Sequence, residues 1–321
     1  MCGIVGYLGK GIAQDSLIDG LRRLEYRGYD SAGVAFHDGK TFSLSRETGR
    51  VENLAKSLIS GCSKSSLGIA HTRWATHGPV TVSNTHPHLS HDKKFALVHN
   101  GVIENFSTLK KFLIQKGIKF ESETDSEVLC NLISYHYEEL PEGKDRFIDA
   151  ISTALGKSRG AYGIAVMCLD YPDMMVGARR GSPLVVGIGD DANFIASDAS
   201  AFVGRAKEAV YLKDGELAIL KGGEFRITNQ EGRDAEAIAQ PLDQTLEEVE
   251  LGDFGSYMEK EIFEQPTALR NTLRGRFGDD GTTAKLGGLE GHENELRNVD
   301  RIVFVACGTA RHACMVAEYL I

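Results

Sequence analysis

Apolar residues in the first 230 positions follow two patterns, one helical and one typical of strands. Helical spacing predicts helices over residues 14–24, 104–116 and about 125–137. The third helix begins with a capping box, in which Thr124 is the N-cap and Glu127 lies three positions later. Short strands joined by tight turns indicate antiparallel sheets rather than an array of βαβ units. Short apolar runs bounded by turn residues predict these strands over residues 33–36, 41–44, 67–71, 95–98, 163–169, 174–178, 183–188, 193–196 and 217–220.

The pattern changes near residue 230. Residues 229–256 are polar, with acidic side chains gathered at 247–253, and we expect them to be a solvated connection between domains. Residues 301–306 form a fully apolar run, which predicts a buried strand followed by a helix over 310–321. This order resembles the start of a parallel βα domain, and no second parallel strand follows. We therefore expect the chain to be a fragment of a longer protein.

Composition and charge narrow the class of protein. The chain of 321 residues is 42% hydrophobic and 25% charged, which is the balance of an ordinary globular protein. Its formal net charge of −9 argues against a general surface for nucleic acid or anionic membranes, and no window reaches the roughly 20 apolar residues of a membrane span. The six cysteines contain no C-x-x-C pair, so neither a zinc site nor a disulfide framework is indicated. We expect a reducing, cytoplasmic setting and a small-molecule substrate.

Cys2 is the candidate nucleophile. Removal of the initiator methionine, which is usual before a small residue, would make Cys2 the N-terminal residue. Such a residue combines a sulfur that attacks a carbonyl group with a free α-amine, of pKa near ~8, that can take the proton. The alternative is that Cys2 is a small buried hydrophobic residue at the start of a strand.

Three further segments carry polar groups at the ends of predicted strands or at a helix start. The run Ala-His-Thr-Arg-Trp-Ala-Thr-His-Gly at 70–78 includes Arg73, whose planar fork suits a carboxylate, although a surface arginine is the simpler alternative. Asn100 and Gly101 could donate to an oxyanion, or could form a plain hairpin turn. Asp125 could hold a substrate ammonium group, or could stabilise the helix dipole. With Cys2, these groups suit acyl transfer from an amino-acid side chain.

Five motifs in the first 125 residues resemble those of the class II glutamine amidotransferases. They are Cys-Gly-Ile-Val-Gly at 2–6, Leu-Glu-Tyr-Arg-Gly-Tyr-Asp-Ser-Ala-Gly at 24–33, the run at 71–78, His-Asn-Gly at 99–101 and Glu-Thr-Asp at 123–125. The resemblance implies an α+β fold for residues 2–240, a four-layer αββα sandwich of antiparallel sheets of the N-terminal nucleophile hydrolase type. It further implies a linker over 241–256, and the incomplete beginning of an α/β sugar isomerase (SIS) domain over 257–321.

The resemblance also implies roles for individual residues. Cys2 would be the nucleophile, and Asn100 and Gly101 would form the oxyanion hole. Trp74 would gate the path by which ammonia leaves. The residues expected to hold the α-groups of glutamine are Arg73, Thr76, His77 and Asp125.

The resemblance also implies two residues on the sugar side of the protein, where Thr309 would contact a sugar phosphate and His86 would lie near the domain interface. His86, His88 and His91 can also be drawn as a metal cluster. We instead expect a surface loop around Pro87, because no cysteine or carboxylate accompanies these histidines at the usual spacing. No metal and no cofactor are therefore expected.

The activity that the resemblance implies is hydrolysis of glutamine to glutamate and ammonia. In the full-length enzyme, expected to be a homodimer, the ammonia would convert fructose 6-phosphate to glucosamine 6-phosphate, the first step of hexosamine synthesis. That synthesis is not expected from the 321 residues alone. The alternatives are another amidotransferase or amide hydrolase of the same fold, or a non-catalytic module that senses sugar phosphates.

Overall fold

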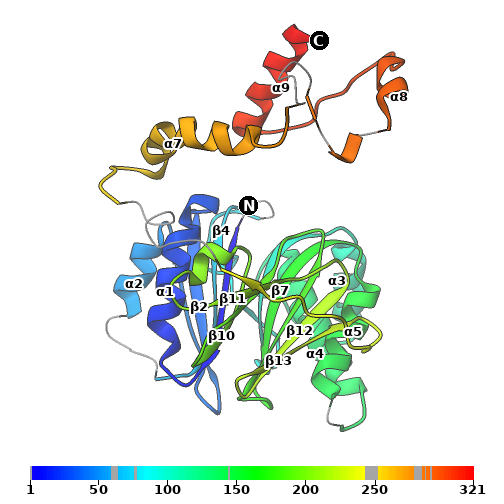
Figure 1. The fold of residues 1–321 in the computed structure, drawn as a ribbon. Helices are drawn as coiled ribbons and strands as arrows, with labels where there is room; N and C mark the ends of the chain where they lie inside the picture. The colour runs from blue at the N-terminus through cyan, green and yellow to red at the C-terminus, as the bar shows by residue number, and fades with distance from the viewer. Residues whose placement is uncertain are drawn as a thin grey trace. The chain divides into compact units, whose positions relative to one another are not determined.

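Two antiparallel sheets occupy the centre of the first of two compact units, Met1–Gly252 and Asp253–Ile321 (Figure 1). The computed structural model describes residues 2–58, 64–75, 78–143, 145–242, 252–277, 284–285, 287–289 and 291–321. In both sheets the neighbouring strands pair in antiparallel register, which confirms the prediction of antiparallel sheets.

The strand order places the N-terminal strand inside one sheet. The eight-stranded sheet runs in the order β14 (Gln240–Pro241), β11 (Glu208–Tyr211), β9 (Val185–Ile188), β10 (Ala192–Ala196), β1 (Gly3–Gly9), β4 (Leu67–Arg73), β2 (Ser31–His37) and β3 (Phe42–Thr48). The six-stranded sheet runs in the order β13 (Glu224–Asn229), β12 (Glu216–Lys221), β8 (Met174–Arg180), β7 (Gly160–Cys168), β6 (Phe95–Ile103) and β5 (His88–Leu89). Because β1 has a neighbour on each side, the backbone that follows Cys2 is held from both edges.

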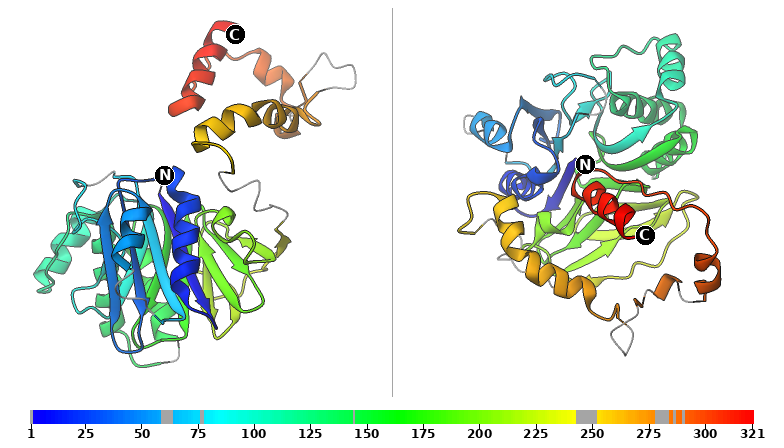
Figure 2. Two further views of the ribbon diagram at one scale, coloured as in Figure 1. Left: turned by 90° about the vertical axis from the view of Figure 1, so that its left-hand side faces the viewer. Right: turned by 90° about the horizontal axis from the view of Figure 1, so that it is seen from above.

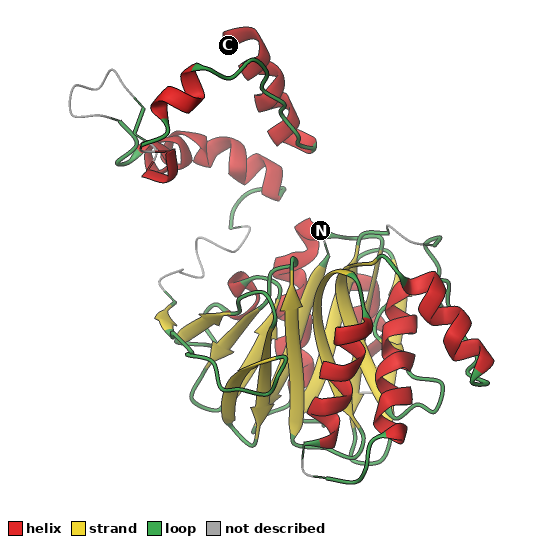
Figure 3. Ribbon diagram, turned by 90° about the vertical axis from the view of Figure 1, so that its right-hand side faces the viewer, coloured by secondary structure: helices red, strands yellow, loops and turns green. Residues whose placement is uncertain are grey.

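Helices cover the outer face of each sheet, which gives four layers. On the eight-stranded sheet lie α1 (Ala13–Leu24) and α2 (Val51–Leu58), as Figure 2 shows. On the six-stranded sheet lie α3 (Phe106–Gln115), α4 (Asp125–Glu139) and α5 (Arg146–Lys157), as Figure 3 shows. The αββα sandwich implied by the family resemblance is therefore confirmed.

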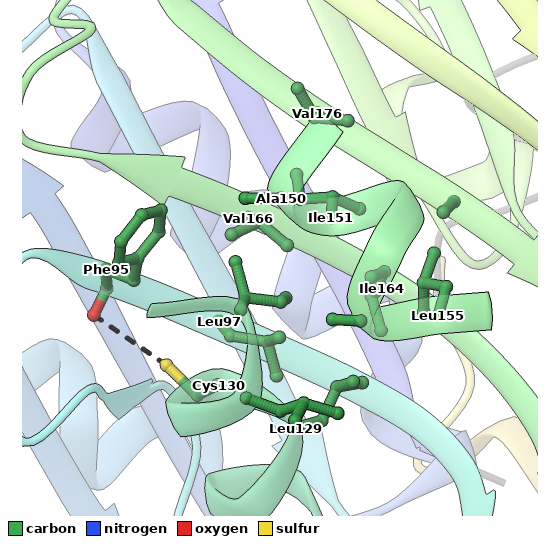
Figure 4. Close-up of a cluster of buried hydrophobic side chains, with 14 of the residues drawn as sticks. Phe95, Leu97, Leu129, Cys130, Ala150, Ile151, Leu155, Ile164, Val166 and Val176 are labelled. Carbon is green, nitrogen blue, oxygen red and sulfur yellow. Dashed lines mark hydrogen bonds between the residues drawn. The ribbon is translucent and has the colours of Figure 1, made fainter. Parts of the chain in front are cut away.

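Three apolar cores hold these layers together. Alternate residues of each strand face opposite sides of its sheet, so Ile4 and Ile69 of one sheet meet Val98 of the other between the two sheets. On the outer side of the six-stranded sheet, Leu97 and Val166 pack against the helices, and the Cys130 thiol lies 3.8 Å from the Phe95 carbonyl oxygen (Figure 4).

The predicted helix cap at Thr124 is confirmed in one of its two hydrogen bonds. Thr124 Oγ1 accepts a hydrogen bond of 3.2 Å from the Glu127 backbone N–H. In a complete capping box the Glu127 carboxylate would turn back to Thr124. It instead accepts from the backbone N–H groups of Glu121 and Ser122, so it orders the loop before the helix.

The second unit differs from the prediction over residues 301–306. These residues form no strand, and Val303 and Val305 are 67% and 90% exposed. In the part of this unit that the structure describes, no strand lies beside the segment, and an extended segment without a partner forms no ladder. The α-helices among the described residues of this unit are α7 (Tyr257–Leu273), α8 (Glu293–Arg297) and α9 (Gly308–Leu320), and a 3-10 helix covers Gly287–Leu289. The last α-helix confirms the predicted terminal helix.

Most of the predicted linker lies outside the described residues, including Glu247, Glu248 and Glu250. Within the described ranges, none of the helices combines the length and the apolar character that crossing a membrane requires.

Candidate active site

Two hydroxyl groups fix the backbone next to Cys2. The Gly3 N–H donates to Thr72 Oγ1 at 3.1 Å, and the Ile4 N–H donates to Ser197 Oγ at 3.0 Å. Gly3 packs so tightly that an added Cβ would lie 2.7 Å from Leu24 Cβ. These contacts leave the start of β1 little freedom, and they place Cys2 at the end of the sheet.

The Cys2 thiol is half-buried and contacts the backbone that follows β4. The Trp74 N–H donates to Cys2 Sγ at 3.1 Å. Burial raises the pKa of the thiol, and the Trp74 N–H and the nearby Arg73 guanidinium offset only part of that effect. The sulfur therefore carries its proton at neutral pH, and an attack on a carbonyl requires a base.

Asn100 and Gly101 lie within β6, so they do not form a hairpin turn. Asn100 Nδ2 donates to the Cys2 carbonyl oxygen at 2.9 Å, which brings the amide beside the thiol residue. Gly101 has a φ of +127°, and an added Cβ would lie 2.1 Å from the Ala161 carbonyl oxygen. Only glycine fits this position, where two backbones come close together.

Arg73 and Asp125 bring opposite charges to the same place. Arg73 ends β4 and is 4% exposed, and it donates to the Pro79 carbonyl oxygen at 3.2 Å. Burial lowers the pKa of the Arg73 guanidinium, and the nearby Cys2, Asp30 and Asp125 side chains partly oppose this shift. Asp125 is the first residue of α4 and accepts from the Ile103 N–H at 2.8 Å.

Cys2, Arg73 and Asp125 line one small cavity of about 30 Å³. Thr76 and His77, also predicted to hold the substrate, lie outside the described residues. The described residues that line the cavity are Cys2, Arg73, Trp74, His86, His99, Gly101, Thr124, Asp125 and Ser126.

Trp74 lies at the outer side of this cavity and is 45% exposed. Its ring meets Tyr29 edge to face, with 5.4 Å between ring centroids. Asp30 holds the adjoining backbone, because its N–H donates to the Arg73 carbonyl oxygen at 3.0 Å and its carboxylate accepts from the Ala75 N–H at 2.9 Å. The turn around Asp30 therefore sets the path of the segment that carries Trp74.

The expectation that His86 and His88 belong to a surface loop is wrong. They are 5% and 2% exposed, and the His86 ring lies 4.2 Å from His71 and 4.6 Å from His88 between centroids. Burial lowers the pKa of both residues well below the usual value. Across the described ranges, no three His, Cys, Asp or Glu side chains are placed to hold a metal ion.

Sequence reasoning missed three residues that support the site. Thr72 and Ser197 hold the start of β1, and His71 contacts Asn100, with 2.9 Å between His71 Nε2 and Asn100 Oδ1. Only Thr72 and His71 had a local signal, since they lie in the run at 70–78. The predicted sugar-side residue Thr309 belongs to α9 of the second unit.

Gly33→Ala is expected to destabilise the first unit by about 1–3 kcal/mol, because overpacking forces the backbone to shift. The added Cβ would lie 2.2 Å from the His86 carbonyl oxygen. Thermal unfolding measures the change. Gly156→Ala in α5 is the control, since its added Cβ has no neighbour within 4 Å, and it is expected to be neutral or stabilising. Equal unfolding temperatures for the two variants would contradict the close approach.

Comparison with known proteins gives consistent results. Residues 71–203 match the family described as glutamine amidotransferase domain. The whole chain is 44% identical to the glutamine–fructose-6-phosphate aminotransferase [isomerizing] of Chlorobaculum tepidum, of which it covers 52%. It is 43% identical to a protein of the same name from Thermus thermophilus, of which it covers 51%. The chain therefore spans about half the length of these curated relatives.

A solved structure with a similar fold is the glutamine phosphoribosylpyrophosphate amidotransferase of B. subtilis. It superposes with a TM-score of 0.61 at 27% identity, over 71% of this chain and 49% of that one.

Proposed function

We propose that the chain is a class II glutamine amidotransferase and that it hydrolyses L-glutamine to glutamate and ammonia at Cys2. The match of residues 71–203 to the glutamine amidotransferase domain family and the names of the relatives support this. The observation that supports this most strongly is the meeting of three groups around one cavity, with an amide donor next to it. The cavity is lined by the Cys2 thiol, the buried Arg73 guanidinium and the buried Asp125 carboxylate. The Asn100 amide is hydrogen-bonded to the Cys2 carbonyl oxygen.

The reaction begins with the proton of the thiol. After removal of Met1, the α-amine of Cys2 takes the proton from Sγ as the sulfur attacks the side-chain amide carbon of glutamine. The resulting tetrahedral intermediate collapses when the amine returns the proton to the leaving nitrogen, which departs as ammonia. Water then attacks the thioester, again with the amine as base, and releases glutamate and the free thiol.

Charge develops on the amide oxygen of glutamine during both attacks. The Asn100 amide has two N–H bonds, of which one is directed at the Cys2 carbonyl oxygen. The other, with the backbone N–H of Gly101, would stabilise the oxyanion. Trp74, half-exposed beside the cavity, would control the departure of ammonia.

The α-groups of glutamine carry one negative and one positive charge. Arg73 would bind the carboxylate, exchanging its bond to the Pro79 carbonyl oxygen for a bidentate contact. Asp125 would bind the ammonium group, and Thr76 and His77 would complete the clamp. The substrate would thus be held at one end while its amide meets Cys2.

Arg73→Lys is expected to raise KM for glutamine by about 10- to 100-fold, because an ammonium group cannot reproduce a bidentate contact worth roughly 1.5–3 kcal/mol. Asp125→Asn is expected to do likewise through the loss of a charge. Initial-rate kinetics measure both. Arg146→Lys is the control, since Arg146 lies at the start of α5 and bonds the Tyr137 carbonyl oxygen. If the Arg73 and Asp125 variants kept the KM of the control, glutamine would have to bind elsewhere.

The decisive test of the function is glutamate release from L-glutamine by the purified protein. Turnover that depends on Cys2 supports the proposal. Release from other amides but not from glutamine would favour a different amide hydrolase of this fold. No release at all from protein that has lost Met1 would favour the non-catalytic sensing module.

For a full-length version with the length of the relatives, of which the chain covers about half, we propose transfer of the ammonia to fructose 6-phosphate, as the names of the relatives suggest. The test is the formation of glucosamine 6-phosphate by a full-length version. We also propose that residues 257–321 begin a sugar isomerase domain, that Thr309 and His86 face the sugar side, and that the whole protein is a cytoplasmic homodimer without nucleic-acid or membrane partners.

A further inference from the structure

A hydrogen bond between the two sheets joins His71 to Asn100. His71 lies on β4 of the eight-stranded sheet and Asn100 on β6 of the six-stranded sheet, with 2.9 Å between His71 Nε2 and Asn100 Oδ1. Their exposed fractions are 1% and 9%. His71 shares a strand face with Ile69, and Asn100 shares one with Val98, and both apolar residues belong to the core between the sheets. The pair therefore adds a polar contact at the end of that core.

The chemistry of the two side chains determines which one donates. An amide oxygen only accepts, so His71 Nε2 carries the hydrogen and donates it to Asn100 Oδ1. At the other end of the amide, Asn100 Nδ2 donates to the Cys2 carbonyl oxygen. A reversed amide would place its oxygen against the Cys2 carbonyl oxygen, and two oxygen acceptors cannot form a hydrogen bond. The Cys2 carbonyl oxygen therefore fixes the orientation of the amide, which leaves Oδ1 to accept from His71.

His71 is suited to a fixed donor role rather than to proton transfer. Burial lowers its pKa to about 3, although the hydrogen bond to Asn100 acts in the opposite direction. The ring is therefore neutral at neutral pH. His71 is also absent from the residues that line the cavity beside Cys2.

We propose that His71 is a positioning residue for glutamine hydrolysis, which holds the Asn100 amide so that its free N–H points toward the oxyanion. The proposal rests on the proposed function above. Because His71 acts through Asn100 and does not contact the substrate, it should influence kcat much more than KM. A donor to Oδ1 also polarises the amide and strengthens its N–H donors.

Glutamine and methionine at position 71 form a matched pair, since they have similar length but only glutamine carries a donor. His71→Met is expected to lower kcat about 10- to 100-fold, which is less than the roughly 10²–10³-fold loss typical of deleting an oxyanion donor itself. His71→Gln is expected to stay within about threefold of wild type, with KM changed less than about threefold in both. If both variants kept the wild-type kcat, or both lost it equally, the hydrogen bond would not have the proposed role.

The control variant is His37→Met. His37 is also buried and hydrogen-bonded, with 3.2 Å between its Nε2 and the Leu169 carbonyl oxygen. It is the last residue of β2, whereas the first residue of that strand, Ser31, is the one that pairs with Arg73. It is expected to lower the unfolding temperature without lowering kcat. A loss of kcat in the control as large as that in His71→Met would assign the effect to general destabilisation and overturn the proposal.

A double-mutant cycle tests whether His71 acts through Asn100. In the Asn100→Ala background, His71→Met is expected to lower kcat by less than about threefold further, because the amide that it positions is gone. Losses that multiply would show that His71 acts independently of Asn100, contrary to the proposal.

The tautomer of His71 gives a measurement that needs neither activity nor a variant. ¹H–¹⁵N NMR of the wild-type protein is expected to show a hydrogen on Nε2 of His71 and a neutral ring from about pH 5 to 9. A hydrogen on Nδ1 alone would overturn the assignment. Absence of glutamate release would refute the proposed function but leave this result unchanged, so the two failures can be distinguished.

Discussion

Cys2→Ala is expected to lower glutamate release by about 10⁴-fold or more, because removal of a nucleophile leaves only binding and oxyanion stabilisation. The fold is expected to persist. The thiol is half-buried, and its hydrogen bond to the Trp74 N–H is worth on the order of 1 kcal/mol. Glutamate release and thermal unfolding, measured on the same preparation, check both parts.

The matched control is Cys314→Ala, which removes another half-buried cysteine, located in α9 of the second unit. It should leave glutamate release unchanged. Intact mass supplies a second check, because the active wild-type protein is expected to lack Met1. An active preparation that retains Met1 would contradict the mechanism, since the α-amine of Cys2 would then be part of a peptide bond and unable to act as base.

Local features of the fold were predictable because their signals lie within a few residues. The helix at α4 and its Thr124 cap depend on spacing and on one side chain near its own backbone. The same kind of signal existed for α5, where Phe147, Ile151 and Leu155 recur at helical spacing, although that helix was not predicted. The four layers came from the family resemblance, since periodicity alone does not say which sheet a helix covers.

Contacts between distant segments could not be predicted from the sequence. His86 and His88 are buried, and the His86 backbone approaches β2 closely at Gly33, more than 50 positions earlier in the chain. The contact between His71 and Asn100 joins strands of different sheets. The apolar run at 301–306 was predicted to form a strand but does not. A strand requires a partner strand, and the described part of its unit supplies none. The residue types alone do not show which distant segments will come into contact.

Asn100→Ala is expected to lower kcat for glutamine by about 10²–10³-fold while changing KM little, because its amide would bind the oxyanion more strongly than the substrate. The variant also leaves the Cys2 carbonyl oxygen and the His71 N–H without this partner. A loss of stability of about 1–3 kcal/mol is therefore expected as well. Steady-state kinetics at saturating glutamine, together with thermal unfolding, separate the two effects.

Asn193→Ala provides the control for that loss of stability. Asn193 is 2% exposed and donates to the Gly223 carbonyl oxygen at 2.9 Å, so its removal also disrupts a buried amide. It lies on β10, where it pairs with Ile188 and Leu8, and its amide bonds the Gly223 carbonyl oxygen rather than the backbone of Cys2. The control should lose stability but keep kcat. If Asn100→Ala kept kcat within about threefold of this control, the Gly101 N–H would have to stabilise the oxyanion without the amide, and His71 would have no catalytic group to position.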